Sequence, residues 1–430
     1  MIILYSFLYS VALAAAMLVS LPYWLFQMLR HGKYRKGFAE RMGRIPARLH
    51  LPAQAEPTIW VHAVSVGEVL AVAGLVEELH HRFPKLKIFV STTTDTGQAL
   101  ARKRFGDGRV FYFPMDFAFA IRPYLWALHP QMVVIAETEF WPNFMRLTHA
   151  SGARIAVVNA RISDRSLPRY WRFRSLIRAV LANVDLFLAQ TVQDASRLQD
   201  IGANTKDISV SGNLKFDIAA PASPAIVEDI RNSIAATGGG PVLVCGSTVD
   251  GEESLLLKPF QNLLVQFPRA VMILAPRHPE RFPAVAALLE NMSIHYRRRS
   301  IWSGESLSGG VLLLDTIGEL AALYALADIA FVGGSLVPHG GHNIIEPAQH
   351  GVAIVVGNHT ENFRDIVSLF QNKDAVRIAG PAELPLMLLD LLANDAKRKA
   401  LGQRALETMR SQMGATARTA DALEELLKRP

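Results

Sequence analysis

The chain contains 430 residues, of which 50% are hydrophobic and 19% are charged, and Cys245 is its only cysteine. So high an apolar content excludes a disordered chain, and a single cysteine excludes a disulfide-stabilised scaffold. The length is sufficient for two domains, each with its own core. The net charge of +7 raises the question of a nucleic-acid partner, which depends on where the charge lies along the chain.

An apolar segment opens the chain, because residues 1–29 contain no Asp, Glu, Lys or Arg. Roughly 20 such residues are enough for a helix that crosses a bilayer. A cleaved signal peptide is the alternative, but no basic residue precedes the apolar run and no clear small-x-small cleavage site ends it. The sequence therefore predicts an uncleaved transmembrane anchor over residues 1–29.

Basic residues follow this segment directly. Residues 30–50 carry seven Lys or Arg against one acidic residue, Glu40, a net of six of the seven excess charges. A nucleic-acid-binding protein places such residues on a folded face, whereas a basic flank beside an apolar helix is typical of a membrane surface. By the positive-inside tendency, the remainder of the chain is expected in the cytoplasm.

Short apolar runs then alternate with amphipathic stretches, which is the pattern of a parallel sheet with helices on its faces. Two series of such runs are present. The first comprises residues 58–64, 87–93, 132–137, 154–160 and 185–190, and the second comprises residues 241–247, 270–276, 310–315, 329–335 and 353–358.

A stretch with Pro221, Pro224 and the glycines at 238–240 separates the two series and predicts a linker. The expected organisation is α/β, with two doubly wound Rossmann-like domains that face a cleft. Ligands of such sheets bind at the carboxyl ends of the strands. The predicted segments are an anchor over 1–29, a first domain over 30–218, a linker over 219–240, and a second domain with the carboxyl-terminal helices over 241–430.

Glu68 follows the first predicted strand and stands near the start of a helix. A carboxylate is favourable at the positive end of a helix, and this alone explains an isolated Glu. The functional alternative is a general base, since the helix end keeps the carboxylate ionised and able to accept a proton.

Two further acids, Glu137 and Glu139, follow the third predicted strand. Alternate residues of a strand share a face, so these carboxylates can converge on a metal or on sugar hydroxyls. The alternative is that only one points inward, because the strand breaks before Pro142.

Metal-binding motifs are absent from the sequence. It has no Asp-x-Asp pair, and its histidines at 62, 278, 339, 342, 350 and 359 lack zinc-protease spacing. We therefore expect no metal site.

Two segments of the second half are suited to bind a nucleotide. The segment PRHPER (276–281) follows a strand, and its arginines can pair with a phosphate. The segment GGS (333–335), followed by GGHNIIEP (340–347), predicts backbone N–H groups that face an anion. Glu346 is suited to bind the vicinal hydroxyls of a ribose.

These segments resemble those of the 3-deoxy-D-manno-octulosonic acid (Kdo) transferases over nearly the whole chain. One difference is Val249, where histidine is expected in many relatives. The segments that carry the resemblance are HAVSVGE (62–68), ETEFWPN (137–143), NARISDRS (159–166), GNLKFD (212–217), GEES (251–254), PRHPERF (276–282), DTIGEL (315–320) and FVGGSLVPHGGHNIIEPA (331–348).

The resemblance implies a GT-B glycosyltransferase that needs no metal, with an amino-terminal acceptor domain and a carboxyl-terminal donor domain. By motif match, Glu68 is the implied catalytic base, and Glu137 and Lys215 are implied to stabilise the transition state. The implied contacts to CMP are Pro276, Arg277, Ile317, Gly318, Glu319, Asn343, Ile344, Ile345 and Glu346.

The implied reaction is an inverting transfer of Kdo from CMP-Kdo to the lipid A precursor, lipid IVA, at the cytoplasmic face of the inner membrane. Inner-membrane phospholipids are the other expected partner, nucleic acid is not expected, and no cofactor is expected. Two alternatives stay open. One is another membrane-associated GT-B transferase, such as the enzyme that adds N-acetylglucosamine from a UDP-sugar to the lipid-linked peptidoglycan precursor. The other is a non-catalytic membrane protein that binds a nucleotide sugar.

Overall fold

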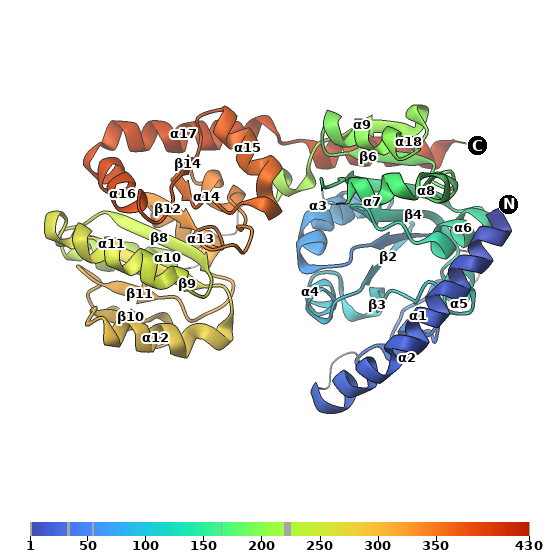
Figure 1. Cartoon of the computed structure of the whole chain (residues 1–430), viewed down its shortest axis with the longest axis horizontal. Coiled ribbons are helices and arrows are strands. Elements are labelled where there is room, and N and C mark those ends of the chain that lie inside the picture. The colour runs from blue at the N-terminus through green and yellow to red at the C-terminus, as the bar shows by residue number, and fades with distance from the viewer. Residues whose placement is uncertain (1, 32–34, 54–55, 165, 219–224, 430) are drawn as a thin grey trace. The chain divides into compact units, whose positions relative to one another are not determined.

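The computed structural model describes residues 2–31, 35–53, 56–164, 166–218 and 225–429. The chain divides into two domains (Figure 1). The first domain comprises Met1–Ile218 and Gln412–Pro430, and the second comprises Ala219–Ser411. Each contains one seven-stranded parallel sheet with helices packed on it. The two parallel α/β domains predicted from the sequence are therefore confirmed.

The first sheet has the strand order β3-β2-β1-β4-β5-β6-β7. The first strand, β1, lies in the middle of the sheet. The chain adds β2 and β3 on one side of β1 and then returns to add β4 on the other side, so the strand order reverses between β1 and β4. The strands are β1 (Thr58–His62), β2 (Lys87–Thr92), β3 (Val110–Tyr112), β4 (Pro130–Ala136), β5 (Arg154–Ala160), β6 (Leu186–Ala189) and β7 (Ile208–Val210). The helices are α1 (Ile2–His31), α2 (Phe38–Arg41), α3 (Val66–Arg82), α4 (Asp95–Phe105), α5 (Ala118–Leu128), α6 (Pro142–Ala150), α7 (Leu167–Arg172), α8 (Arg174–Leu181), α9 (Val192–Asp200) and α18 (Ala415–Lys428).

Both faces of this sheet are buried, which is why its strands are continuous apolar runs. Every residue of β1 is buried. Trp60 packs with side chains of α5 and α6, and its neighbours Ile59 and Val61 pack on the opposite face with side chains of α3 and α18. The alternation of strand side chains thus fills two separate cores in one domain.

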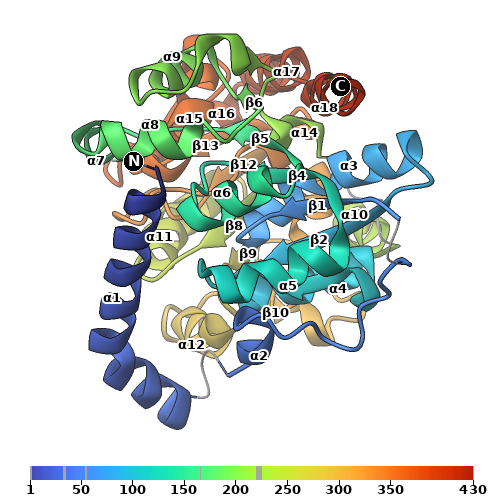
Figure 2. The ribbon, with the colours of Figure 1, turned by 90° about the vertical axis from the view of Figure 1, so that its right-hand side faces the viewer.

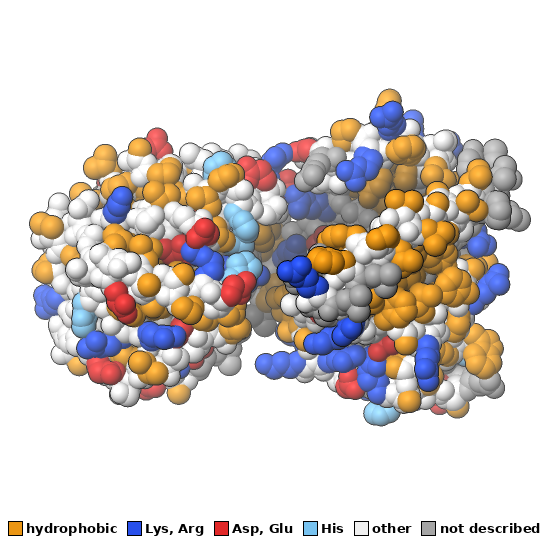
Figure 3. Space-filling view, turned by 60° about the horizontal axis from the view of Figure 1, so that its bottom comes forward, with side chains coloured by type: hydrophobic (Ala, Val, Ile, Leu, Met, Phe, Trp, Pro, Cys, Tyr) orange, Lys and Arg blue, Asp and Glu red, His pale blue; other side chains and the backbone are white. Residues whose placement is uncertain are grey.

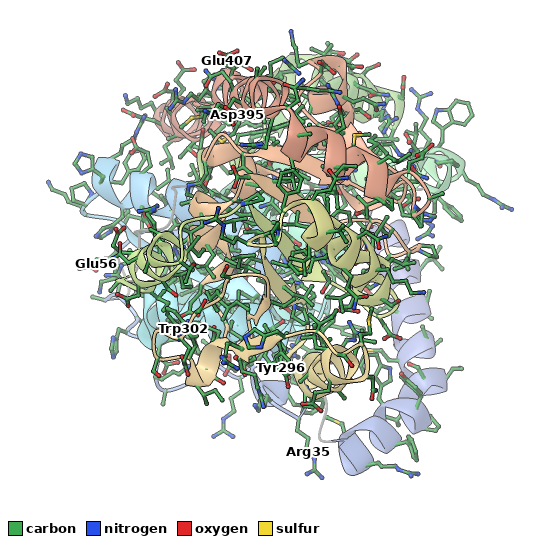
Figure 4. All side chains as sticks on the ribbon, turned by 90° about the vertical axis from the view of Figure 1, so that its left-hand side faces the viewer. Arg35, Glu56, Tyr296, Trp302, Asp395 and Glu407 are labelled. Carbon is green, nitrogen blue, oxygen red and sulfur yellow. The ribbon has the colours of Figure 1, made fainter. Side chains whose placement is uncertain are left out.

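The second sheet has the order β10-β11-β9-β8-β12-β13-β14, and its direction reverses between β8 and β12. The strands are β8 (Val242–Thr248), β9 (Val271–Pro276), β10 (Tyr296–Arg298), β11 (Val311–Leu313), β12 (Ile329–Val332), β13 (Ala353–Val356) and β14 (Arg377–Ile378). The helices are α10 (Ala225–Ala236), α11 (Glu252–Gln266), α12 (Phe282–Asn291), α13 (Leu320–Leu323), α14 (Ile345–Gln349), α15 (Arg364–Asn372), α16 (Leu384–Ala393) and α17 (Asp395–Ser411). In Figure 4, Tyr296 and Trp302 mark the side of this domain near β10, and Asp395 and Glu407 mark α17 on the opposite side.

The amino-terminal helix α1 lies along the first domain beside α6 (Figures 1 and 2). The side-chain amide of Asn143 donates a hydrogen bond of 3.0 Å to the hydroxyl of Ser10. Within the part of the chain that the structure describes, no helix combines the length and the apolar character that a membrane crossing requires, so the transmembrane helix predicted over residues 1–29 is not shown.

Part of the basic segment after α1 stabilises the fold. The guanidinium of Arg48 binds both carboxylate oxygens of Glu40, at 2.7 and 3.0 Å. The guanidinium of Arg41 lies over the ring of Tyr112, 4.5 Å from its centroid. These two charges are therefore engaged within the domain, whereas Arg35 and Lys36 are exposed and Lys33 lies outside the described residues.

The predicted linker is shorter than expected. Residues 225–236 form helix α10, because Val227, Ile230 and Ile234 share one apolar helix face that packs into a core of the second domain. The proline-containing part, residues 219–224, lies outside the described residues.

The carboxyl-terminal segment differs from the prediction that residues 241–430 form one domain. Helix α17 ends at Ser411, and α18 then packs on α3 of the first domain. The carboxylate of Asp217 fixes its start by accepting from the backbone N–H groups of Gly414 and Thr416, at 2.7 and 2.5 Å. The physical reason is that the apolar face of α18, with Leu423 and Leu426, completes the core of the first sheet.

Replacing Asp217 with Ala is expected to destabilise the first domain by about 1 to 2 kcal/mol, because two N–H groups at a helix start lose their acceptor. Urea unfolding followed by circular dichroism measures this loss. Asp200→Ala, at an exposed position of α9, is the control and should change stability far less. Equal effects of the two substitutions would show that Asp217 does not hold α18.

Candidate functional site

Carboxylates gather at the carboxyl ends of β1 and β4, where the order of the first sheet reverses. This is the position at which doubly wound sheets bind their ligands. Glu68 lies just after β1, at the start of α3, and Glu137 lies just after β4. The electrostatic interactions of Glu68 with Glu137 and Glu139 show that all three acids lie close together. The predicted convergence of acids at this edge is therefore present.

Glu68 caps helix α3 as well as facing its acidic neighbours. Ser65 is the N-cap residue, and its hydroxyl accepts from the Glu68 backbone N–H at 3.4 Å. The Glu68 carboxylate in turn accepts from the Val64 N–H at 2.7 Å and from the Ser65 hydroxyl at 3.0 Å. This reciprocal arrangement is a form of the capping box. The capping and catalytic interpretations of Glu68 are thus compatible in one geometry.

The environment of Glu68 holds its pKa near neutrality. Burial is the largest cause, and the negative charge of Glu137 is the second; together they raise the pKa to about 7, although the hydrogen bonds from Val64 and Ser65 oppose the shift. Only 8% of the residue is exposed. A carboxylate whose pKa lies near the working pH is suited to general acid–base catalysis.

Lys215 neutralises part of this acidic cluster. Its ammonium lies 3.2 Å from the Glu137 carboxylate, and both side chains are only partly buried. Glu137 adopts a left-handed backbone conformation, with φ of 58°, and its N–H donates to the carbonyl of Val158. This strained turn directs the Glu137 side chain out of the strand.

Asn159 is a positioning residue that sequence analysis did not single out. Its side-chain oxygen accepts from the backbone N–H of Leu214 at 3.0 Å, which holds the short turn that carries Lys215. Asn159 is itself in the left-handed region, with φ of 53°, and its carbonyl accepts from the Gln190 side chain. In the sequence, this role is indicated by a polar Asn near the end of an otherwise apolar strand.

The residues predicted to contact CMP follow three strands of the second sheet, all at their carboxyl ends. Pro276 ends β9, and Arg277 comes next with an exposed side chain that forms no hydrogen bond or ion pair within the described part of the chain. The segment Ile317, Gly318 and Glu319 follows β11, and Asn343, Ile344, Ile345 and Glu346 follow β12. The sheet order places β11, β9, β8 and β12 side by side.

Two of the predicted polar groups already have internal partners. Arg281 is not free to pair with the phosphate of a ligand, because its guanidinium pairs with the carboxylates of Glu253 and Asp250. The Glu319 carboxylate accepts from Arg299 at 2.7 Å and also binds the Thr316 hydroxyl. Glu346 is the third of these polar groups, and burial raises the pKa of its carboxyl. Its carboxylate accepts a hydrogen bond from the Asn343 side chain at 3.4 Å.

The backbone N–H groups of residues 334–336, in the glycine turn after β12, are not free for a ligand anion, contrary to the prediction. Glu252, which is fully buried, fills this position with its own carboxylate. One oxygen accepts from the N–H groups of Ser335 and Leu336, both at 2.8 Å, and the other accepts from Gly334 at 2.7 Å and Val249 at 3.0 Å. The N–H groups of residues 334–336 therefore bind a carboxylate of the protein, where the prediction expected a ligand.

Gly333 and Val249 lie beside the Glu252 carboxylate, and the structure shows why each residue suits its position. A Cβ at Gly333 would lie 2.6 Å from the carbonyl oxygen of Ser247, so the close approach of β8 requires glycine. Val249 contributes its backbone N–H to Glu252, a group that any residue but proline supplies, and its side chain is buried.

His62 is a core residue rather than a ligand. It is fully buried, stacks on Phe113 at 3.9 Å, and bonds through Nδ1 to the Ser91 hydroxyl. Burial lowers its pKa to about 3, so the ring is neutral. Among the described residues, no group of three or more His, Cys, Asp or Glu side chains could hold a metal ion.

Comparison with known proteins identifies the family. The family model for 3-deoxy-D-manno-octulosonic-acid transferase matches residues 36–218. The 3-deoxy-D-manno-octulosonic acid transferase of Haemophilus influenzae is 32% identical over 400 residues, covering 92% of this chain and 93% of that protein. The chain belongs to the Kdo transferase family. It is therefore a glycosyltransferase.

Two further similarities extend this result. The Kdo transferase of Bordetella pertussis is 36% identical over 422 residues, covering 94% of this chain and 95% of that protein. A putative UDP-N-acetylglucosamine 2-epimerase from Listeria monocytogenes has a similar fold, with a TM-score of 0.61 at 15% identity over 87% of this chain and 97% of that chain. The second likeness concerns the fold alone.

The raised pKa of Glu68 predicts a specific pH dependence of stability. The folded protein binds this proton more tightly than the unfolded chain, so the contribution of Glu68 to stability falls as pH rises from about 4.5 to about 7. The Glu68→Gln variant has no carboxyl to titrate at this position, so it does not lose stability in this way as the pH rises. The difference in unfolding free energy, variant minus wild type, should rise by on the order of 2 to 3 kcal/mol between about pH 5 and about pH 8.

Urea denaturation across this pH range measures the difference. The exposed Glu425→Gln is the control and should run parallel to the wild type. A Glu68→Gln profile that also runs parallel would contradict a raised pKa at Glu68.

Proposed function

We propose that the protein transfers Kdo from CMP-Kdo to the lipid A precursor, lipid IVA. Membership of the Kdo transferase family supports the sugar and the reaction class. The observation that carries the mechanism is the cluster of Glu68, Glu137 and Lys215 at the reversal point of the first sheet. The cluster contains both a proton acceptor whose pKa is near 7, the Glu68 carboxylate, and a positive charge, the Lys215 ammonium.

In this mechanism Glu68 accepts the proton of an acceptor hydroxyl. The hydroxyl oxygen forms a bond to the anomeric carbon of Kdo, and the bond from that carbon to the phosphate oxygen of CMP breaks. Its electron pair leaves with CMP, and attack opposite to the leaving group inverts the anomeric centre. The Lys215 ammonium, held by Glu137, stabilises negative charge that develops near the reacting atoms.

Donor binding is assigned to the second domain, through Pro276, Arg277, the loop 317–319 and the loop 343–346. CMP carries a single phosphate as leaving group, and a guanidinium can neutralise it by paired hydrogen bonds. On this basis we propose that the reaction needs no metal and no cofactor.

Membrane attachment completes the proposal. We propose that the protein acts at the inner membrane, with its catalytic domains in the cytoplasm. Exposed basic residues after α1, such as Arg35 and Lys36, would attract anionic phospholipids and the phosphorylated acceptor.

The donor can be tested directly by offering CMP-Kdo and UDP-N-acetylglucosamine to the purified protein with lipid IVA, and analysing the products by mass spectrometry. The proposal requires Kdo addition with release of CMP, and no transfer from the UDP-sugar. Transfer from the UDP-sugar would identify the alternative transferase, and binding of either donor without turnover would indicate a non-catalytic protein.

Glu68→Gln is expected to lower turnover by roughly 100-fold or more, because the amide preserves the size of the side chain but cannot accept a proton. CMP affinity should stay within about twofold of the wild type, since the assigned CMP contacts lie in the other domain. Turnover and calorimetric CMP titration on one preparation give both values. Near-normal turnover in this variant would remove Glu68 as the base.

A further inference from the structure

Helices α7 and α8 present a basic surface on the first domain. Between residues 165 and 184 the sequence has five arginines and no Asp or Glu. Leu167, Tyr170, Ile177 and Leu181 face inward and pack on a core of this domain, which fixes the two helices. In Figure 3, Lys and Arg side chains, in blue, and hydrophobic side chains, in orange, stand beside one another on this domain, drawn at the right. The inward positions of α7 and α8 are therefore apolar, and the charge is left on their outward face.

The arginines of this outward face have no internal partner. The four that the structure describes are exposed: Arg169, Arg172, Arg174 and Arg178. Their guanidinium groups form no hydrogen bond or ion pair with any other described residue. Two aromatic side chains, Trp171 and Phe173, lie among them and are 60% and 55% exposed. Because like charges repel one another, an anion that contacts several of these arginines at once is favoured.

This basic surface begins beside the acidic cluster of the first domain. The ring of Phe140, the residue after Glu139, lies 5.8 Å from that of Tyr170 in α7, between centroids. The Tyr170 hydroxyl interacts electrostatically with both Glu139 and Arg169. Glu139 in turn interacts with Glu68. The arginines of α7 therefore stand at the edge of the site where an acceptor hydroxyl would meet Glu68.

The chemistry of this surface fits the headgroup of a phosphorylated lipid. Guanidinium groups bind phosphate oxygens through paired hydrogen bonds. Exposed Trp and Phe beside Arg are typical of helices that meet the boundary between lipid and water. A small soluble anion would use the arginines but would leave Trp171 and Phe173 exposed to water. A ligand that is both anionic and lipidic uses both kinds of side chain.

We propose that the outward face of α7 and α8 binds a phosphate group of the lipid acceptor, chiefly through Arg169 and Arg172. This inference rests on the proposed function and deepens it, since it names residues that select the acceptor. Arg169 and Arg172 are three residues apart on one helix, so they share a face and can bind the same phosphate. Trp171 and Phe173 contact the apolar part of the lipid. The bound phosphate thereby holds the acceptor while its hydroxyl lies at Glu68.

The test compares lipid IVA with the same lipid from which the phosphates have been removed, both dispersed in a nonionic detergent. Initial rates of Kdo transfer by the full-length wild type, Arg169→Gln and Arg172→Gln give KM and kcat for each acceptor. Each variant should raise KM for the phosphorylated acceptor about fivefold and keep kcat within about twofold of the wild type. On the dephosphorylated acceptor both variants should match the wild type. Arg122→Gln, which removes an exposed arginine of α5, is the control and should match the wild type on both acceptors.

Unchanged KM for the phosphorylated acceptor in both variants would overturn the proposal. An equal rise in KM for the two acceptors would also overturn it, because the arginines would then not act on the phosphate. Sedimentation with phosphatidylglycerol vesicles tests the other source of lipid phosphate. Variants that keep their KM but lose vesicle binding would assign this surface to bilayer phospholipids, against the proposal. A wild type that transfers Kdo to neither acceptor would contradict the proposed function, and this inference with it.

Discussion

The burial of one carboxyl group, that of Glu68, is the physical constraint on which the acidic site of the first domain depends. This burial, followed by the negative charge of Glu137, raises the pKa of Glu68 to about 7, and the Val64 N–H and the Ser65 hydroxyl stabilise the ionised form against the shift. Lys215 supplies the positive charge that such an acidic cluster needs. Each group depends on a turn at a strand end, which explains why strained backbone occurs at Glu137 and Asn159.

The second domain uses a buried carboxylate differently. Glu252 also stands at the start of the helix that follows the first strand of its sheet, but its carboxylate binds the backbone of two loops. The glycine turn is thereby held by hydrogen bonds within the domain itself. Rigid loops that carry a few exposed charged groups reduce the entropy lost on binding.

Sequence predicts the long buried strands well, because runs such as residues 58–62 and 242–248 are buried on both faces and are therefore mostly apolar. It misses β3, β7, β10 and β14, since two or three residues are too few to show a period. The return of α18 to the first domain and the capture of the glycine turn by Glu252 depend on contacts between distant segments. Motif resemblance named Glu68, Glu137 and Lys215, but only the structure shows how Asn159 holds the turn that carries Lys215.

We propose that the environment of Glu68, rather than its identity alone, makes it a base. Carbon-13 NMR of the labelled Glu68 carboxyl carbon, assigned through Glu68→Gln, measures its ionisation directly. The account predicts a midpoint near pH 7 in the wild type. The midpoint should fall in Glu137→Gln, because this change removes a negative charge beside Glu68. It should rise in Lys215→Met, because the negative charge of Glu137 then has no ammonium to neutralise it. A wild-type midpoint near the ordinary value of 4.5, unmoved by either substitution, would contradict the account.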